Sequence, residues 1–409
     1  MRVKHRRPSS FNTKQIINVL FLLTILIGFA AIYNLHGRVK LLPIHMNDNQ
    51  EPSLASSAVA EKSPPVCSLV TLDRIKKQLD PENCRKSSLR PWVQFCSFTE
   101  ATKCPDATWI DDYYKNTFHS NVASNDAHPF LAKSVGCNKG FDAINTMRMG
   151  TLNQHFNKDE WVKEMGVTDN NVCLQNETLQ FNIQGVSTLS SSLTVRQGEM
   201  HCIELMPKTS QKLKQTATVL QVADKGFVVS GVGIGKMDGT HTLRDVAKVG
   251  LENQGMATAS GCDKSTDVGC MEVPVYSLNN YVDKFVRSKG PIHFLSIDAE
   301  GFDFEIIQGG QEILSRVEYL EFEYNWVGPW KTKSLSEVIE YLNHNYDFTC
   351  YFAGNGMLWR ITDCFLDYYE LHFWSNICCV NRHHVVELAK SMELLFEQTV
   401  ARDDIQYMG

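Results

Sequence analysis

Two acidic residues, Asp298 and Glu300, directly follow a short apolar run, Phe294–Ile297, and precede Gly301. Side chains two apart on an extended strand end point the same way, so both carboxylates would face one space. Paired acceptors of this kind suit a general base, a metal ligand or a grip on a hydroxyl group. The competing interpretation is an acidic turn that caps the next helix. We expect a functional site here, because open α/β sheets bind ligands beyond the carboxyl ends of their strands.

A second candidate is the turn Gly136-Cys137-Asn138-Lys139-Gly140, which lies between an expected strand and a helix-forming stretch. Glycines at such a turn let a ligand approach the backbone, and N–H groups at a helix start can bind polar ligand atoms. We therefore take Gly136, Cys137, Asn138 and Gly140 as candidate cofactor-binding residues. A lone G-x-x-x-G spacing also marks many ordinary tight turns.

Glu204 ends the next expected strand and is a third candidate. In a nucleotide-binding sheet, an acid at this place can accept both ribose hydroxyls, although helix capping is an alternative role. A further glycine run, Gly231–Gly235, matches G-x-G-x-G more closely than the first turn. Because Lys236–Thr240 continues it as a turn, we expect a bend between two strands, with a cofactor loop as the alternative.

The elements that must position these residues alternate between short apolar strands and helical stretches from about residue 116 onward, which indicates an α/β fold. An Ala353–Gly356 turn near the end of the chain predicts an antiparallel hairpin. The expected strands are Phe130–Val135, His201–Leu205, Phe227–Ser230, Ile292–Ile297, Val317–Glu323, Phe348–Phe352, Met357–Ile361 and Ile377–Val380.

Taken in order, these segments resemble the FkbM-type family of S-adenosylmethionine-dependent methyltransferases. The family carries a D-V-G-A-N-x-G-like loop, an F-E-P-like acid, a G-x-x-x-G-x-x-x-L-like stretch and a K-I-D-V-E-G-x-E-x-x-V-L-x-G-like signature. The counterparts here are SVGCNKG (Ser134–Gly140), IELMP (Ile203–Pro207), GKMDGTHTL (Gly235–Leu243) and SIDAEGFDFEIIQG (Ser296–Gly309). Ser134 stands in place of the Asp that opens the family's glycine-bearing loop, and Ser296 stands in place of the Lys that opens its last signature.

The resemblance implies a Rossmann-like methyltransferase sheet, mostly parallel with a C-terminal antiparallel hairpin. It also implies S-adenosylmethionine as the cofactor and methyl transfer to a hydroxyl oxygen. We expect Asp298 as the base, with Glu300 orienting the acceptor or binding the cofactor, and no metal. Asp142, His293 and Glu323 are secondary candidates.

The N-terminus carries an uncharged run of 18 residues at 16–33, about 27 Å long as a helix, which predicts a transmembrane signal anchor. Five basic residues precede it, so the positive-inside rule predicts a cytoplasmic tail at 1–15 and a lumenal remainder. A cleaved signal peptide is the alternative. All 13 cysteines follow the run, in keeping with an exported domain, and their odd number leaves at least one unpaired within the chain.

We expect a flexible stem at 34–66, a Cys-bearing extension at 67–115 and a methyltransferase domain at 116–400. Disulfides in the extension are favoured over zinc, because its cysteine spacing lacks paired C-x₂-C. Anchor, stem and lumenal domain resemble the plan of Golgi enzymes, so the acceptor is expected to be a glycan, and the net charge of −6 gives no support to nucleic-acid binding. Two alternatives stay open. One is a Golgi glycosyltransferase with a D-x-E metal site at Asp298 and Glu300, and the other is a non-catalytic lumenal binding module.

Overall fold

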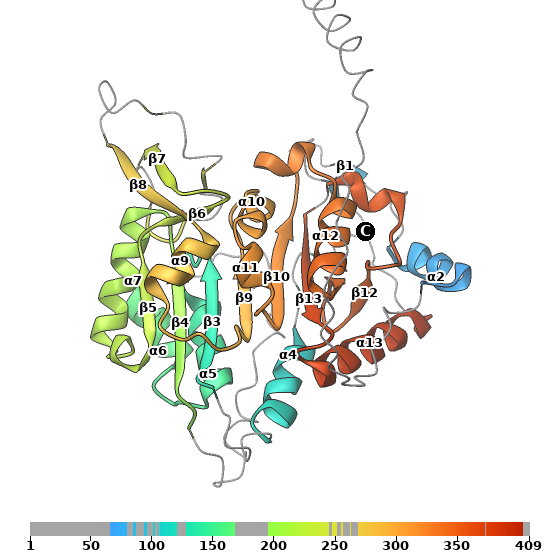
Figure 1. The fold of residues 1–409 in the computed structure, drawn as a ribbon, viewed down its shortest axis with the longest axis horizontal. Helices are drawn as coiled ribbons and strands as arrows, with labels where there is room; N and C mark the ends of the chain where they lie inside the picture. The colour runs from blue at the N-terminus through green and yellow to red at the C-terminus, as the bar shows by residue number, and fades with distance from the viewer. Residues whose placement is uncertain are drawn as a thin grey trace, which may run out of the picture. The chain divides into compact units, whose positions relative to one another are not determined.

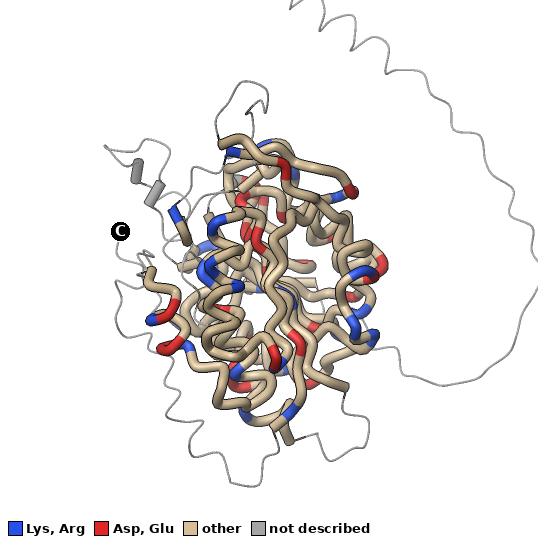
Figure 2. Tube along the Cα trace, turned by 90° about the vertical axis from the view of Figure 1, so that its left-hand side faces the viewer, with Lys and Arg blue, Asp and Glu red and all other residues tan. Residues whose placement is uncertain are grey.

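The structure is a computed structural model of the 409-residue chain. It describes residues 66–79, 85–86, 94–95, 101–102, 105, 107–120, 128–167, 195–244, 248–251, 255–256, 262, 269–372 and 374–403. These residues belong to one compact unit, Glu61–Gly409. Within it, acidic and basic residues are interspersed along the described chain (Figure 2).

An eight-stranded sheet forms the centre, in the order β12-β11-β13-β10-β9-β3-β4-β5 (Figure 1). Its strands are β3 (Phe130–Val135), β4 (Gly198–Ile203), β5 (Phe227–Ser230), β9 (Phe294–Ile297), β10 (Tyr319–Tyr324), β11 (Phe348–Ala353), β12 (Leu358–Arg360) and β13 (Ser375–Asn381). The five strands from β5 to β10 are mutually parallel, whereas β13 is antiparallel to both its neighbours and β11–β12 is an antiparallel pair. The expected α/β class, with a mostly parallel sheet and a C-terminal hairpin, is confirmed.

The strand order reverses between β3 and β9, because the chain builds β4 and β5 on one side of β3 and then crosses to β9 and β10 on the other. Such a reversal is the topological switch point at which open α/β sheets bind ligands. β3 is buried almost throughout, as expected of a central parallel strand covered on both faces.

Helices cover both faces of the sheet (Figure 1). On one face, α5 (Phe141–Thr151) packs against Gly198 of β4, and Trp109 of α4 (Thr108–Tyr113) donates to the Tyr319 hydroxyl. On the other face, Tyr281 of α9 (Leu278–Phe285) contacts His201 of β4. The other described α-helices are α2 (Leu69–Leu79), α6 (Lys158–Met165), α7 (Pro207–Val219), α10 (Asp303–Gln308), α11 (Gln311–Leu314), α12 (Leu335–Tyr346) and α13 (Val386–Ala401).

The glycine run at 231–235 joins β5 to a small three-stranded sheet, as expected for a bend between two strands. This sheet has the order β6-β8-β7, with β6 (Gly233–Gly235), β7 (Gly239–Arg244) and β8 (Cys270–Ser277). A two-stranded pair, β1 (Arg85–Lys86) and β2 (Gln94–Phe95), lies in the Cys-bearing extension. A continuous helical run, α4 and then Tyr114–Phe118, crosses the predicted boundary between residues 115 and 116.

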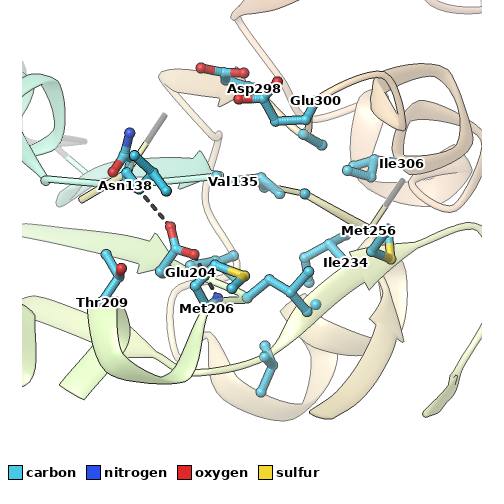
Figure 3. A pocket seen from close by; sticks show the side chains of 18 residues that line it. Val135, Asn138, Glu204, Met206, Thr209, Ile234, Met256, Asp298, Glu300 and Ile306 are labelled. Carbon is cyan, nitrogen blue, oxygen red and sulfur yellow. Dashed lines mark hydrogen bonds between the residues drawn. The ribbon is translucent and has the colours of Figure 1, made fainter. Parts of the chain in front are cut away.

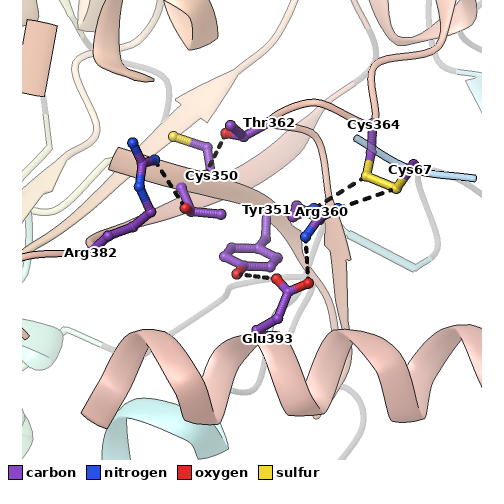
Figure 4. A network of polar contacts seen from close by, with 9 residues as sticks. Cys67, Cys350, Tyr351, Arg360, Thr362, Cys364, Arg382 and Glu393 are labelled. Atoms are coloured by element: carbon purple, nitrogen blue, oxygen red, sulfur yellow. Dashed lines mark hydrogen bonds and ion pairs between the residues drawn. A yellow bond between two sulfur atoms is a disulfide. The ribbon is translucent and has the colours of Figure 1, made fainter. Parts of the chain in front are cut away.

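Four disulfides occur in the described part of the chain: Cys67–Cys364, Cys137–Cys202, Cys262–Cys270 and Cys350–Cys379. The first joins the extension to the main domain beside Arg360, which also pairs with Glu393 (Figure 4). Cys67 is therefore not a zinc ligand, while Cys84, Cys96 and Cys104 lie outside the described residues. Among the described cysteines, buried Cys378 is free, and its neighbour Cys379 is bonded across the sheet.

No helix within the described ranges is long and apolar enough to cross a bilayer. The predicted anchor at 16–33, the tail at 1–15 and residues 34–65 of the predicted stem all lie outside those ranges. The anchor, the tail and the stem stay predictions.

Candidate functional site

The loops after β3 and β9 meet at the switch point with no space between them. The Asp298 N–H donates to the Val135 carbonyl (2.9 Å), which extends the β3–β9 ladder beyond both strands. Gly136 has φ +78°, and a Cβ built there would lie 1.7 Å from the Asp298 carbonyl oxygen. Only glycine fits this position, so the sequence at 136 sets the distance between the two candidate loops.

Glu204 organises the glycine-bearing turn from the neighbouring strand. Its carboxylate accepts the N–H of Asn138 (2.8 Å) and the N–H of Met206 (2.7 Å), and the side chain is buried (Figure 3). Asn138 itself has φ +46°, a conformation that few residues other than glycine adopt. The structure thus brings Glu204 and the turn together, although they are far apart in the chain.

A hollow of about 610 Å³, part of it open to solvent, lies beyond these strand ends. Five predicted site residues line it: Gly136, Asn138, Glu204, Asp298 and Glu300. Its lining also includes apolar Val232, and Ile234, Met256 and Ile306 form the side away from Asn138 (Figure 3). Ile234 belongs to β6, so the second glycine run contributes to the same pocket as the first. The pocket therefore joins an acidic rim to an apolar wall.

Cys137 and Gly140 do not line this pocket. Cys137 is bonded to Cys202 of β4, and its N–H donates to the Ile203 carbonyl (3.0 Å). Gly140 has φ +73° and precedes α5, where an added Cβ would lie 3.0 Å from both Leu213 and Trp161. In this structure both residues shape the turn, and direct cofactor contact by either stays a prediction.

A second pair of acids, Asp303 and Glu323, lies behind Asp298 and Glu300. Asp303, in the first turn of α10, is fully buried and accepts from the Trp330 indole (3.3 Å) and the Ala299 N–H (3.4 Å). Glu323, near the end of β10, accepts from Asn325 (2.6 Å) and from the Trp374 indole. Burial and the Asp298 charge raise the pKa of Asp303 to about 7. Burial, with Asp298 as the strongest charged neighbour, raises the pKa of Glu323 well above its usual range.

The structure separates the secondary candidates. Glu323 lies behind the pocket, whereas His293 precedes β9 at the opposite end of the sheet and bonds the backbone of Leu131 (3.0 Å). Burial lowers the pKa of His293 to about 3, and its ring packs against Phe118 and Phe130 in the core. Asp142 is exposed in the first turn of α5.

Sequence reasoning gave Asp303 no role at all. Its signal in the sequence was its place in the first turn of a helix that follows Asp298 and Glu300. Among the described residues, no three His, Cys, Asp or Glu side chains gather in an arrangement that could hold a metal ion.

One family model matches part of the chain. A family model described as Methyltransferase FkbM domain matches residues 180–350, a range that contains Glu204, Asp298, Glu300 and Glu323. No curated protein matches the chain.

One solved structure with detectable similarity is Methyltransferase FkbM from Methylobacillus flagellatus KT, at 11% identity and a TM-score of 0.31. The alignment covers 66% of this chain and 50% of that one, so the chain spans half the length of that relative. A likeness of this size carries no argument about geometry. The resemblance seen in the sequence is confirmed over residues 180–350, which match the family model of the methyltransferase FkbM domain.

Proposed function

We propose that the pocket binds S-adenosylmethionine and that the domain transfers a methyl group to a hydroxyl oxygen. The observation that carries this proposal is the convergence of Glu204, the Asn138 turn and Asp298 around one pocket at the switch point. Dinucleotide-binding sheets place their ligands at the same crevice.

The residues present suit this cofactor. Glu204 lines the pocket just beyond β4, where an acid in a nucleotide-binding sheet can accept ribose hydroxyls. The apolar wall of Val232, Ile234 and Met256 suits a purine ring. Carboxylates at Asp298 and Glu300, which line the same pocket, favour a cation nearby.

The bound cofactor would supply an electrophilic methyl carbon on a sulfonium. The protein must then align a hydroxyl oxygen with that carbon, and alignment alone can supply about 7–11 kcal/mol of barrier reduction. We assign Asp298 as the base that accepts the hydroxyl proton, a role worth roughly 10²–10⁴-fold in rate. Asp298 is exposed at the pocket rim, so the proton can return from it to water.

Our assignment of the acceptor and the compartment rests on separate observations. The run at 16–33 is the proposed anchor of a single-pass type II protein in a Golgi or other secretory-pathway membrane. The described disulfides support an oxidising lumen, because such bonds are rare in the cytosol. A glycan hydroxyl is therefore the proposed acceptor. Half-exposed Trp326, which follows β10, offers an aromatic face for a sugar ring, whereas Trp330 is fully buried in the core.

Calorimetric titration of the full chain in detergent, with S-adenosylmethionine and with S-adenosylhomocysteine, tests the cofactor. Both should bind, and Glu204→Gln should weaken both at least tenfold, because an amide cannot accept the Asn138 and Met206 N–H groups together. Asp224→Asn, on a surface turn outside the pocket, is the matched control and should bind like the parent chain.

Two results would overturn the proposal. If neither compound binds at millimolar concentration, the non-catalytic binding module is favoured, since Ser134 and Ser296 replace two charged residues of the family pattern. If instead a nucleotide sugar binds in the presence of manganese, the glycosyltransferase alternative gains.

A further inference from the structure

Asp298 has a carboxyl neighbour on the next strand. β9 and β10 are parallel, and their last register pair is Ile297 with Phe322. The next residues along the two strands are Asp298 and Glu323. Asp298 directly follows β9 and is the strongest charged neighbour of Glu323, as expected if the register continues by one residue. Gly136 has no side chain, so Glu323 is the side chain that flanks Asp298 in the sheet.

Glu323 is held in place from two directions. The Asn325 amide donates to one of its carboxyl oxygens from the loop after β10, and the Trp374 indole donates to the other from the residue before β13. With both oxygens bonded, the carboxyl group cannot turn into solvent without losing a partner. These two contacts therefore hold the Glu323 carboxyl group at the end of β10.

The surrounding charges disfavour a second anion beside Asp298. The charged groups that act on Glu323 are Asp298 from the end of β9, Asp303 from α10 and Glu300 from the strained turn between them. All three are acids, and together with burial they raise the pKa of Glu323 well above its usual range. Because nearby like charges disfavour the ionised form of a carboxyl group, the Asp298 carboxylate favours the protonated form of Glu323.

We infer that Glu323 is a positioning residue for Asp298: it carries a proton at neutral pH and so keeps Asp298 as the carboxylate that accepts the hydroxyl proton. This inference rests on the proposed function. In the reaction, the acceptor oxygen forms its bond to the methyl carbon while the methyl–sulfur bond breaks and its electron pair stays on sulfur. The hydroxyl proton passes to Asp298, and Glu323 keeps its own proton throughout.

The test uses the charge difference between the two cofactor forms, so it needs no acceptor. S-adenosylmethionine carries a sulfonium cation, and S-adenosylhomocysteine carries a neutral sulfur at the same place. When Glu323 loses its proton on raising the pH, the new charge should favour the cation. The ratio of the two affinities in the full chain should therefore rise roughly tenfold as Glu323 titrates.

Glu323→Gln has no carboxyl proton to lose and should flatten the pH dependence of this ratio while both compounds still bind, although the amide keeps only one of the two contacts from Asn325 and Trp374. The matched control is Glu318→Gln: burial also raises the pKa of Glu318, to about 7, but this residue lies just before β10 at the other end of the strand. The control should keep the pH dependence of the parent chain. Thermal unfolding of each variant shows that the fold is retained, and Asp303→Asn, which should shift the titration to lower pH, provides a second reading.

An unchanged pH dependence in Glu323→Gln, with both compounds bound, would overturn the inference and leave the proposed function standing. If the parent chain binds neither compound, the proposed function is overturned instead.

Discussion

The Cys137–Cys202 disulfide ties the turn that carries Asn138 to the strand that carries Glu204, and its removal should damage cofactor binding more than stability alone explains. The bond closes a separation of 65 residues. The chain-entropy relation gives a stabilisation of about 4.3 kcal/mol for a loop of that size. Cys137→Ala/Cys202→Ala should lower the free energy of unfolding by about that amount.

The same double variant should also bind S-adenosylmethionine about tenfold more weakly. Freeing the backbone of one residue in the turn costs about 1–2 kcal/mol when a ligand orders it again, and 1.4 kcal/mol is a factor of ten in affinity. Cys350→Ala/Cys379→Ala is the matched control. It opens a separation of 29 residues, worth about 3.6 kcal/mol, between β11 and β13 and outside the pocket lining.

Urea unfolding at 25 °C and calorimetric titration measure the two effects separately. Both variants should lose similar stability, and only the first should lose affinity. Equal affinities in the two variants would refute the reasoning that this disulfide organises the cofactor turn.

Three further predictions follow from individual contacts. Gly136→Ala should unfold at much lower temperature than Gly166→Ala: both sites have positive φ, but a Cβ at 136 meets the Asp298 carbonyl whereas one at 166 meets nothing within 4 Å. Equal melting temperatures would contradict this. Gln78→Ala should lower the free energy of unfolding in urea by about 2–4 kcal/mol, because the buried Gln78 amide hydrogen-bonds with Thr399, Arg402 and Trp359. Lys77→Ala, at an exposed position, should lower it by less than about 0.5 kcal/mol. The third concerns pH. Since the folded pKa of Asp303 is raised from 3.8 to about 7, the folded state holds more protons than the unfolded one between these values, and stability should fall as pH rises from 4 to 7. Asp303→Asn should flatten that slope in unfolding at pH 5, 6, 7 and 8, and an unchanged slope would count against the assignment.

Much of the fold was predictable because its strands are short, apolar and bounded by turns. Phe130–Val135 and Phe227–Ser230 form strands with the predicted bounds. The shared pocket of Glu204 and Asp298 also follows from the sequence, since acids at the carboxyl ends of parallel strands lie along the same edge of the sheet. The predicted strand His201–Leu205 starts and ends earlier, at Gly198 and Ile203, so Glu204 lies just beyond it.

What could not be predicted depends on register and on pairing in three dimensions. Cys137 gave no sign of its partner, because 13 cysteines allow many pairings. The effect of Glu323 on Asp298 comes from the β9–β10 register. The β3–β9 register also pairs the two residues that depart from the family pattern, because Ser134 on β3 lies opposite Ser296 on β9. A family Asp and Lys at these places would stand side by side, so their joint replacement leaves no unpaired charge.

The Cys67–Cys364 bond has a consequence for how the protein behaves when it is cut. It joins positions 297 residues apart, so nearly the whole described chain lies inside one covalent ring. A protease that cleaves one peptide bond inside this ring releases no fragment, because the disulfide still joins the two pieces of the chain. The nicked protein would run as a single species on a gel until a reductant is added, and only then would it release two pieces.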